Sequence, residues 1–188
     1  MSETWIKIEV SKGNQYQNES TGEVILAYGT DYDGRWLDLK TKIDNDQVTI
    51  VNLEDTDAHK EQLKLNKIND SSSYWYAKSM ADITYNTKVF AITSMTYTYV
   101  LGQQQAAKLH EEANGAGTWS YDNWRLKDRT YYSFDLTDLN GFGMVLAGQT
   151  ENCAKNENDH AVAIAALDVT VKTAAEIEAY DFTLDLQV

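Results

Sequence analysis

The chain of 188 residues contains no proline, although proline usually makes up about 5% of a protein. This absence excludes proline-rich linkers, collagen-like repeats and cis-proline turns. Gly, Asn and Asp must therefore form the turns. Strand edges also lack the protection that proline gives, so either charged side chains protect them or they pair with other copies of the chain. A homo-oligomer is one expectation from this composition.

Cysteine and positive charge are scarce as well. Cys153 is the single cysteine, so no disulfide can form within the chain. Sixteen Lys and Arg residues stand against 29 Asp and Glu residues, which gives a net charge of −13. A chain so acidic is repelled by phosphate backbones and by anionic membrane surfaces. The composition therefore predicts that nucleic acid is not a partner.

Long apolar runs are missing too. No stretch of the sequence reaches the length needed to cross a bilayer,. The first residues, Met1-Ser2-Glu3-Thr4-Trp5, lack the basic and then apolar pattern of a signal peptide,. The sequence predicts that the protein is not an integral membrane protein. It also predicts a cytoplasmic protein, or one released without a conventional signal peptide.

The patterning that is present is mainly that of β-strands. Apolar and polar residues alternate over 6–10, 37–43 and 182–188, which is typical of half-buried strands. Further strands are predicted over 23–28, 47–53, 74–85, 88–101, 130–137, 142–149 and 161–172. Short helices are predicted over 58–65 and 103–113, and a capping box at Thr173–Glu176 predicts one more helical turn,.

This pattern predicts an all-β protein. We expect one domain over residues 1–188, built as an antiparallel β-sandwich of jelly-roll type or as a barrel, with one to three short peripheral helices.

Sequence signatures of catalysis are largely missing. The chain contains no G-x-S-x-G, no phosphate-binding P-loop, no H-E-x-x-H and no C-x-x-C motif,. His160 follows a polar stretch that holds Cys153, but a nucleophilic cysteine also needs an activated thiolate and an oxyanion site. The sequence therefore favours binding over catalysis, and an enzyme stays an open alternative.

Two carboxylate pairs could bind calcium. Asp31 and Asp33 precede Gly34, and Asp44 and Asp46 form a second pair. Alternating carboxylate oxygens in tight turns suit calcium, while the same residues are also common in ordinary turns. We predict no cofactor other than this calcium.

Two aromatic clusters are the most informative feature. The first is Tyr74, Trp75 and Tyr76, and the second is Trp119, Tyr121 and Trp124. If Tyr74–Tyr76 lay in a strand, at least one ring would point outward. Such rings stack on the C–H faces of sugars, and they can also hold a quaternary ammonium group by cation–π attraction.

The favoured function is therefore a lectin-like, non-catalytic module that binds a glycan through these six residues. One alternative is a membrane-active, pore-forming-like toxin that recognises a lipid headgroup with the same aromatics. Another is a self-assembling structural protein, such as a virion, tail or inclusion component.

Overall fold

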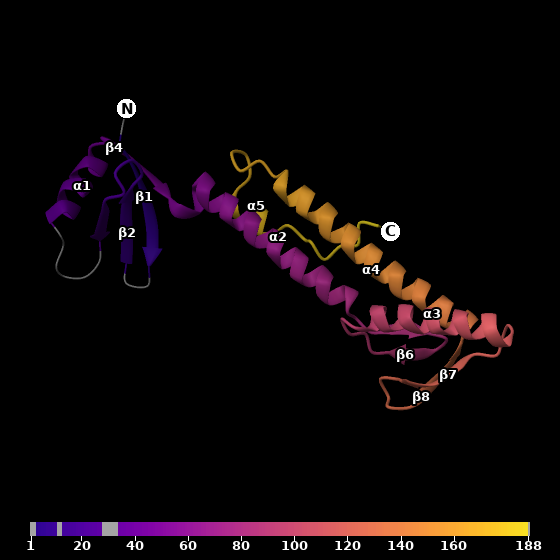
Figure 1. Ribbon diagram of the computed structural model, residues 1–188. Coiled ribbons are helices and arrows are strands. Elements are labelled where there is room, and N and C mark those ends of the chain that lie inside the picture. The colour runs from indigo at the N-terminus through magenta and orange to yellow at the C-terminus, as the bar shows by residue number, and fades with distance from the viewer. Residues whose placement is uncertain (1–2, 11–12, 28–33, 188) are drawn as a thin grey trace. The chain divides into compact units, whose positions relative to one another are not determined.

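The computed structural model describes residues 3–10, 13–27 and 34–187. Over these residues it contains five α-helices and eight β-strands (Figure 1). The strands form one four-stranded sheet and two separate hairpins, and the three longest helices have 19, 23 and 30 residues. The prediction of an all-β sandwich or barrel with one to three short helices is therefore wrong, because the protein is α/β.

The chain divides into two compact units. Unit 1 holds the residues up to Lys67 together with Ile164–Tyr180, and unit 2 holds Ile68–Ala163 together with the residues from Asp181 onward. Helices α2 (Asp57–Ser79) and α4 (Leu136–Ala165) contribute residues to both units. Because of this sharing, the expectation of one domain over 1–188 stays a prediction.

Unit 1 is built on a mixed sheet in the order β3-β2-β1-β4. Its strands are β1 (Glu3–Val10), β2 (Gly13–Asn18), β3 (Val24–Ala27) and β4 (Val48–Asn52). Strand β2 pairs antiparallel with both β1 and β3, and β4 pairs parallel with β1. Helix α1 (Gly34–Asp44) connects β3 to β4, and its Leu39 packs on the core formed by Trp5, Tyr16 and Ile25.

Two lysines connect the remaining parts of unit 1. The 3₁₀ turn η1 (Leu53–Asp55) leads into α2, where Lys60 and Lys64 are both more than nine-tenths buried. Lys60 Nζ donates to the carbonyl oxygen of Val169 at 2.8 Å, and Lys64 Nζ donates to that of Leu167 at 2.9 Å. These bonds attach the chain after α4 to α2. Helix α5 (Ala174–Glu178) follows in the same unit.

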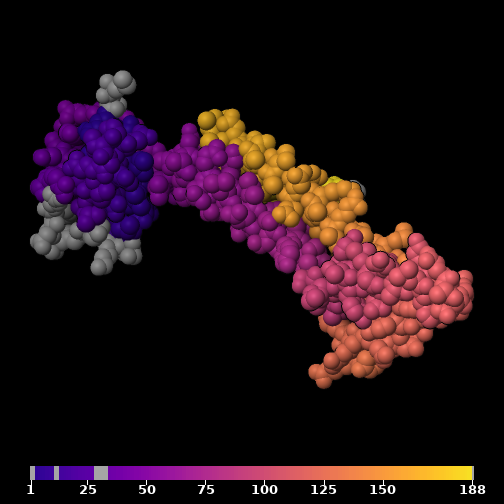
Figure 2. Space-filling model, in the orientation of Figure 1, coloured from indigo at the N-terminus to yellow at the C-terminus, as the bar shows by residue number. Residues whose placement is uncertain are grey.

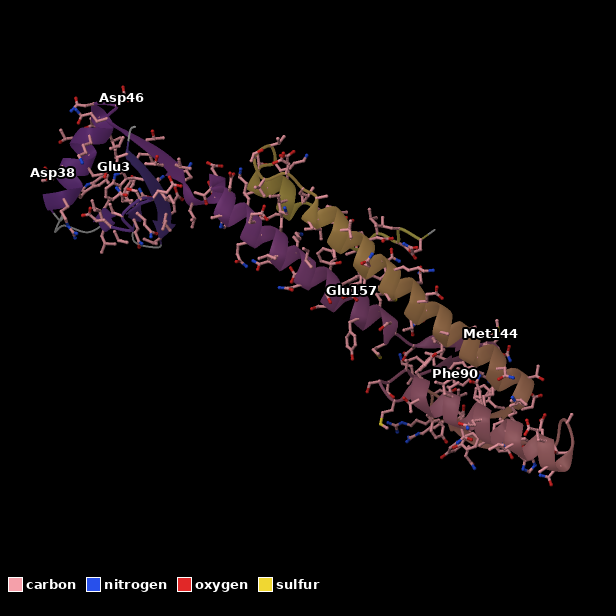
Figure 3. The ribbon with its side chains drawn as sticks, turned by 45° about the horizontal axis from the view of Figure 1, so that its top comes forward. Glu3, Asp38, Asp46, Phe90, Met144 and Glu157 are labelled. Carbon is pink, nitrogen blue, oxygen red and sulfur yellow. The ribbon has the colours of Figure 1, made fainter. Side chains whose placement is uncertain are left out.

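Unit 2 surrounds an aromatic core. Two hairpins, β5 (Ile83–Tyr85) with β6 (Lys88–Phe90) and β7 (Ser120–Arg125) with β8 (Tyr131–Asp135), pack with α3 (Thr96–Asn114) and α4. The space-filling view shows α3 against the β7–β8 hairpin on the face that it draws (Figure 2). Phe90 is fully buried, and its ring centroid lies 4.6 Å from that of Phe142 (Figure 3). The buried members of this core are Ile83, Phe90, Val100, Trp124, Leu126, Phe134, Leu139, Phe142 and Leu146.

Several predicted elements are confirmed. The structure has strands where 6–10, 23–28, 47–53 and 130–137 were predicted, although β8 ends at Asp135. The predicted helix over 103–113 is the second part of α3, which stops at Asn114 before Gly115 with φ of 100°. The capping box is present: the Thr173 hydroxyl accepts from the Glu176 N–H at 3.2 Å. The helix predicted over 58–65 is the first part of α2, and the Thr56 hydroxyl caps its first turn by accepting from the His59 N–H at 3.2 Å.

Other predicted strands are helical. Residues 37–43 lie in α1, where Trp36, Leu39 and Ile43 form a helical stripe on the sheet while Leu37 is exposed. Residues 74–79 belong to α2, 96–101 to α3, and both 142–149 and 161–165 to α4. Residues 182–187 form turns instead of a strand.

One glycine of α4 lies against the β5–β6 hairpin. Gly141 is inside the helix, where a Cβ would overlap the hydroxyl of Tyr85. The glycine therefore permits close packing of the β5–β6 hairpin on α4.

Candidate ligand-binding site

A pocket of about 490 Å³ opens in unit 2, at the N-terminal half of α3. This volume lies in the range of small-molecule sites. The residues before α3 form one part of its wall, one side of the helix forms another, and Trp124 of β7 adds an indole ring. The lining residues are Thr93, Met95, Thr96, Thr98, Tyr99, Gly102, Gln103 and Trp124.

Two threonines hold the start of α3 in place. The Thr96 hydroxyl accepts a hydrogen bond from the Thr93 N–H at 2.9 Å, and the two hydroxyl oxygens lie 3.1 Å apart. Thr96 is buried, so this contact fixes the backbone that forms the pocket wall. The wall therefore exists before any ligand arrives, which lowers the entropic cost of binding.

The aromatic part of the pocket is anchored in the core. Trp124 is 8% exposed, and its ring packs edge-on against Phe134 and Phe142 with centroids 5.4 and 5.6 Å away. Tyr99 lies beside it, with the two ring centroids 5.3 Å apart, but Tyr99 is 42% exposed. Tyr99 thus presents the accessible ring of the pocket, and the buried Trp124 ring packs against it.

The polar groups of the pocket are hydroxyls and an amide. Tyr99 Oη donates to Tyr121 Oη at 2.7 Å. Burial raises the pKa of the Tyr99 phenol, the hydrogen bond to Tyr121 acts in the same direction, and one with the Gln103 side chain opposes them. The phenol therefore stays neutral at physiological pH. None of the eight lining residues carries a charge, so the pocket suits a neutral ligand that combines an apolar face with hydroxyl groups.

A second pocket of about 480 Å³ shares Thr93 with the first. Its lining is also mainly apolar and includes Tyr97, which is half-exposed, and Glu151 of α4. In the strand predicted over 88–101, Tyr97 and Tyr99 would share one face. In the helix they point in different directions, and each lines a different pocket.

The second predicted aromatic cluster lies at the first pocket in part. Trp124 lines the pocket, and Tyr121 bonds to a residue that lines it. Trp119 is partly buried against the core of unit 2 and is not among the lining residues. The structure thus brings Tyr121 and Trp124 together with Tyr99.

The first predicted cluster is placed differently. Tyr74, Trp75 and Tyr76 lie on α2 and not in a strand. One ring, that of Tyr76, does point outward, but the spacing of a helix places it there. Trp75 is 5% exposed, and its Nε1 donates to the carbonyl oxygen of Phe182 at 3.0 Å. Tyr74 contacts the Phe182 ring edge-on, whereas Tyr76 is exposed. None of the three lines the first pocket.

The predicted calcium ligands are not gathered in the part of the chain that the structure describes. Asp31 and Asp33 lie outside the described residues. Asp44 ends α1 and pairs with Lys40 at 2.7 Å, while Asp46 lies in the turn that follows, with φ of 54° (Figure 3). Over residues 3–10, 13–27 and 34–187, no group of three or more His, Cys, Asp or Glu side chains is close enough to hold a metal ion.

Cys153 and His160 both lie on α4 and are buried. Burial, helped by the nearby Asp185 carboxylate, raises the pKa of the Cys153 thiol. A protonated, buried thiol is a poor nucleophile. His160 Nε2 lies 2.8 Å from the carbonyl oxygen of Leu184, so this nitrogen serves a structural hydrogen bond.

Sequence reasoning missed most of the pocket wall. Met95, Thr98, Gly102 and Gln103 belong to a segment whose first part was interpreted as a strand. One signal in the sequence could have found part of this wall. Thr96, Tyr99 and Gln103 are spaced by three and four residues, which places them on one face of a helix,.

Within the described ranges, no helix is both long and apolar enough to span a membrane. Comparisons with protein-family models, with curated proteins and with solved structures find no match to this chain.

Proposed function

We propose that unit 2 binds a carbohydrate without catalysis, in the pocket between α3 and Trp124. The observation that carries this proposal is the uncharged lining, in which an exposed Tyr99 ring stands among threonine hydroxyls and the Gln103 amide. A sugar ring presents an apolar C–H face and hydroxyl groups at its edge, and both match this lining. An anionic ligand would meet a chain of net charge −13 without a cation in the pocket wall.

Gly102 permits a sharp test of this site. A Cβ at Gly102 would meet no heavy atom within 4 Å, and Gly102 lies inside α3. Gly102→Leu should therefore raise helix stability by up to about 1 kcal/mol while its side chain fills the pocket. Tyr99→Ala should remove the exposed stacking ring and weaken binding by about 1 kcal/mol, or roughly fivefold in Kd.

The assay is a glycan array, followed by titration calorimetry of the best sugars and by tryptophan fluorescence. The matched control is Tyr76→Ala, which removes an exposed tyrosine outside the pocket. We expect Gly102→Leu to abolish sugar binding in a folded protein and Tyr76→Ala to leave it unchanged. Choline and phosphocholine are included as the competing ligand class. Binding of choline but of no sugar, or sugar binding that survives Gly102→Leu, would overturn the proposal.

A further inference from the structure

Residues 181–187 lie on unit 2 without forming a helix or a strand. Within this segment the structure shows two local turns, in which the Thr183 N–H donates to Asp181 Oδ1 and the Gln187 N–H donates to Asp185 Oδ1, both at 2.9 Å. Such turns shape a chain but do not fix its position. The segment is held in place by side chains of α2 and α4.

These side chains contact the main chain of every second residue. Trp75 Nε1 of α2 donates to the carbonyl oxygen of Phe182 at 3.0 Å, and His160 Nε2 of α4 lies 2.8 Å from that of Leu184. The Leu186 N–H donates to Asn156 Oδ1 at 2.6 Å. Each of these hydrogen bonds uses a main-chain atom of the segment, so together they fix the register in which the segment lies on the two helices.

Side chains of the segment are recognised as well. The Asp185 carboxylate accepts from Asn156 Nδ2 at 2.8 Å and from Asn152 Nδ2 at 3.1 Å. The Phe182 ring meets Tyr74 edge-on, with centroids 6.0 Å apart. The contacts therefore select an aromatic residue followed, three positions later, by an aspartate.

Three of the helix side chains that make these contacts, Trp75, Asn156 and His160, are buried. Asn156 is 0% exposed, His160 is 1% exposed, and the His160 ring stacks on Trp75 with centroids 6.0 Å apart. Figures 1 and 3 show α2 and α4 side by side along this stretch, and Ser72 Oγ donates to Glu157 Oε1 at 2.5 Å between them. Buried amides and imidazoles are costly unless each is hydrogen-bonded, and the segment supplies main-chain partners to these groups.

We propose that this polar seam, formed by Trp75, Asn152, Asn156 and His160, is a peptide-recognition site for an aromatic residue followed three positions later by an aspartate, the pattern of Phe182 and Asp185. Its partner between molecules is residues 181–187 of a second copy of the chain. Every copy carries both the seam and the segment, so an exchanged segment makes the same contacts as the chain's own. Exchange of an identical element is a low-cost route to a dimer.

A boundary between the two units falls where the segment begins. The chain up to Tyr180 belongs to unit 1, and from Asp181 it belongs to unit 2, so the described contacts that seat the segment start at the boundary between units. Within one molecule the segment competes at an effective concentration of roughly millimolar. Exchange should therefore become visible when the chain's own segment is weakened.

The test uses two complementary full-length variants. Asn156→Ala damages the seam and leaves the segment intact, whereas Phe182→Ala/Asp185→Ala damages the segment and leaves the seam intact. In a mixture, the intact segment of the first variant should occupy the intact seam of the second. We expect sedimentation velocity to show a one-to-one complex that is at least about tenfold tighter than self-association of either variant. A chain with all three substitutions is the matched control and should not form this complex.

A second measurement covers loss of folding. A synthetic peptide of residues 181–187 should bind the Phe182→Ala/Asp185→Ala variant in fluorescence anisotropy, or restore its melting transition if that variant has lost it. The same peptide with Asp185→Ala should do neither. The proposal is overturned if the mixed variants show no complex at concentrations approaching the roughly millimolar effective concentration. It is also overturned if the intact peptide neither binds nor restores folding.

Discussion

Gly141 and Gly148 lie in the same helix, α4, yet alanine should have opposite effects at the two positions. A Cβ at Gly148 meets no heavy atom within 4 Å, whereas a Cβ at Gly141 overlaps the Tyr85 hydroxyl. The Tyr85 ring cannot simply swing aside, because its hydroxyl donates to Asp138 Oδ1 at 2.9 Å and lies 3.1 Å from the Asp138 carbonyl oxygen. Alanine at Gly141 must therefore break these hydrogen bonds.

The magnitudes follow from two contributions to the free energy of unfolding. Replacing glycine with alanine inside a helix stabilises it by about 0.5–1 kcal/mol, and Gly148→Ala should show this gain alone. Gly141→Ala has the same gain but loses a hydrogen bond to a carboxylate, which contributes about 1.5–3 kcal/mol. We expect Gly141→Ala to be destabilising by about 0.5–2.5 kcal/mol, so the two variants should differ by about 1.5–3 kcal/mol.

Urea unfolding followed by circular dichroism measures this difference, with an unchanged m-value as the sign that both variants unfold from comparable states. In the Tyr85→Phe background the hydroxyl is gone, so adding Gly141→Ala should cost little or be stabilising. If Gly141→Ala stabilises the parent protein as much as Gly148→Ala does, the close approach of Tyr85 to α4 is refuted.

Three further outcomes are expected. Burial and a hydrogen bond to a carboxylate raise the pKa of Tyr85 to about 12. Stability should therefore be full below the ordinary pKa near 10 and should decline as the pH rises toward 12, and a pH series of urea midpoints should show a shallower decline in Tyr85→Phe. Hydrogen bonds, of which the backbone N–H of Gln187 gives the largest effect, lower the pKa of Asp185, so the hydrogen-exchange protection factors of residues 181–187, taken relative to the intrinsic exchange rate at each pH, should fall as the pH drops below about 4; an Asp185→Asn variant should not show this acid step. Lys64→Met leaves the Leu167 carbonyl without its donor and should lower the free energy of unfolding by about 1–2 kcal/mol, whereas a Lys40→Met control at an exposed ion pair should change it by less than about 1 kcal/mol in a urea titration,.

The sequence predicts those elements in which the apolar residues are the buried ones, or in which the signal lies within a few neighbouring residues. In β1 the alternation of Ile6 and Ile8 with charged residues matches a strand in a sheet. The Thr173–Glu176 capping box needs no distant residue to form, and it is present. The Asn114-Gly115 stop of α3 is local in the same way.

Helix α2 is hard to predict because its buried stripe is largely polar. On α2 the buried positions include Lys60, Lys64, Ser71 and Trp75, at helical spacing. A search for apolar periodicity does not detect lysines and serines, although long lysine side chains can bury their methylene groups. The pocket at α3 is hard to predict for a related reason, because a strand period places Tyr97 and Tyr99 on one face, whereas in the helix they line different pockets.

The buried residues of α4 explain why the helix is hard to predict from the sequence. They also explain why the polar seam selects one peptide. The buried stripe begins with Leu139, Phe142 and Leu146, continues through Asn156 and His160, and ends at Ile164. An aliphatic continuation would have revealed the helix in the sequence, but it would also accept any apolar segment, since burial of apolar surface is non-directional. A buried amide left without a partner costs about 1–3 kcal/mol, so a segment that lacks the aspartate and the correct main-chain register is penalised. The polar residues that obscure the helical pattern are therefore the ones that make this face selective for one peptide.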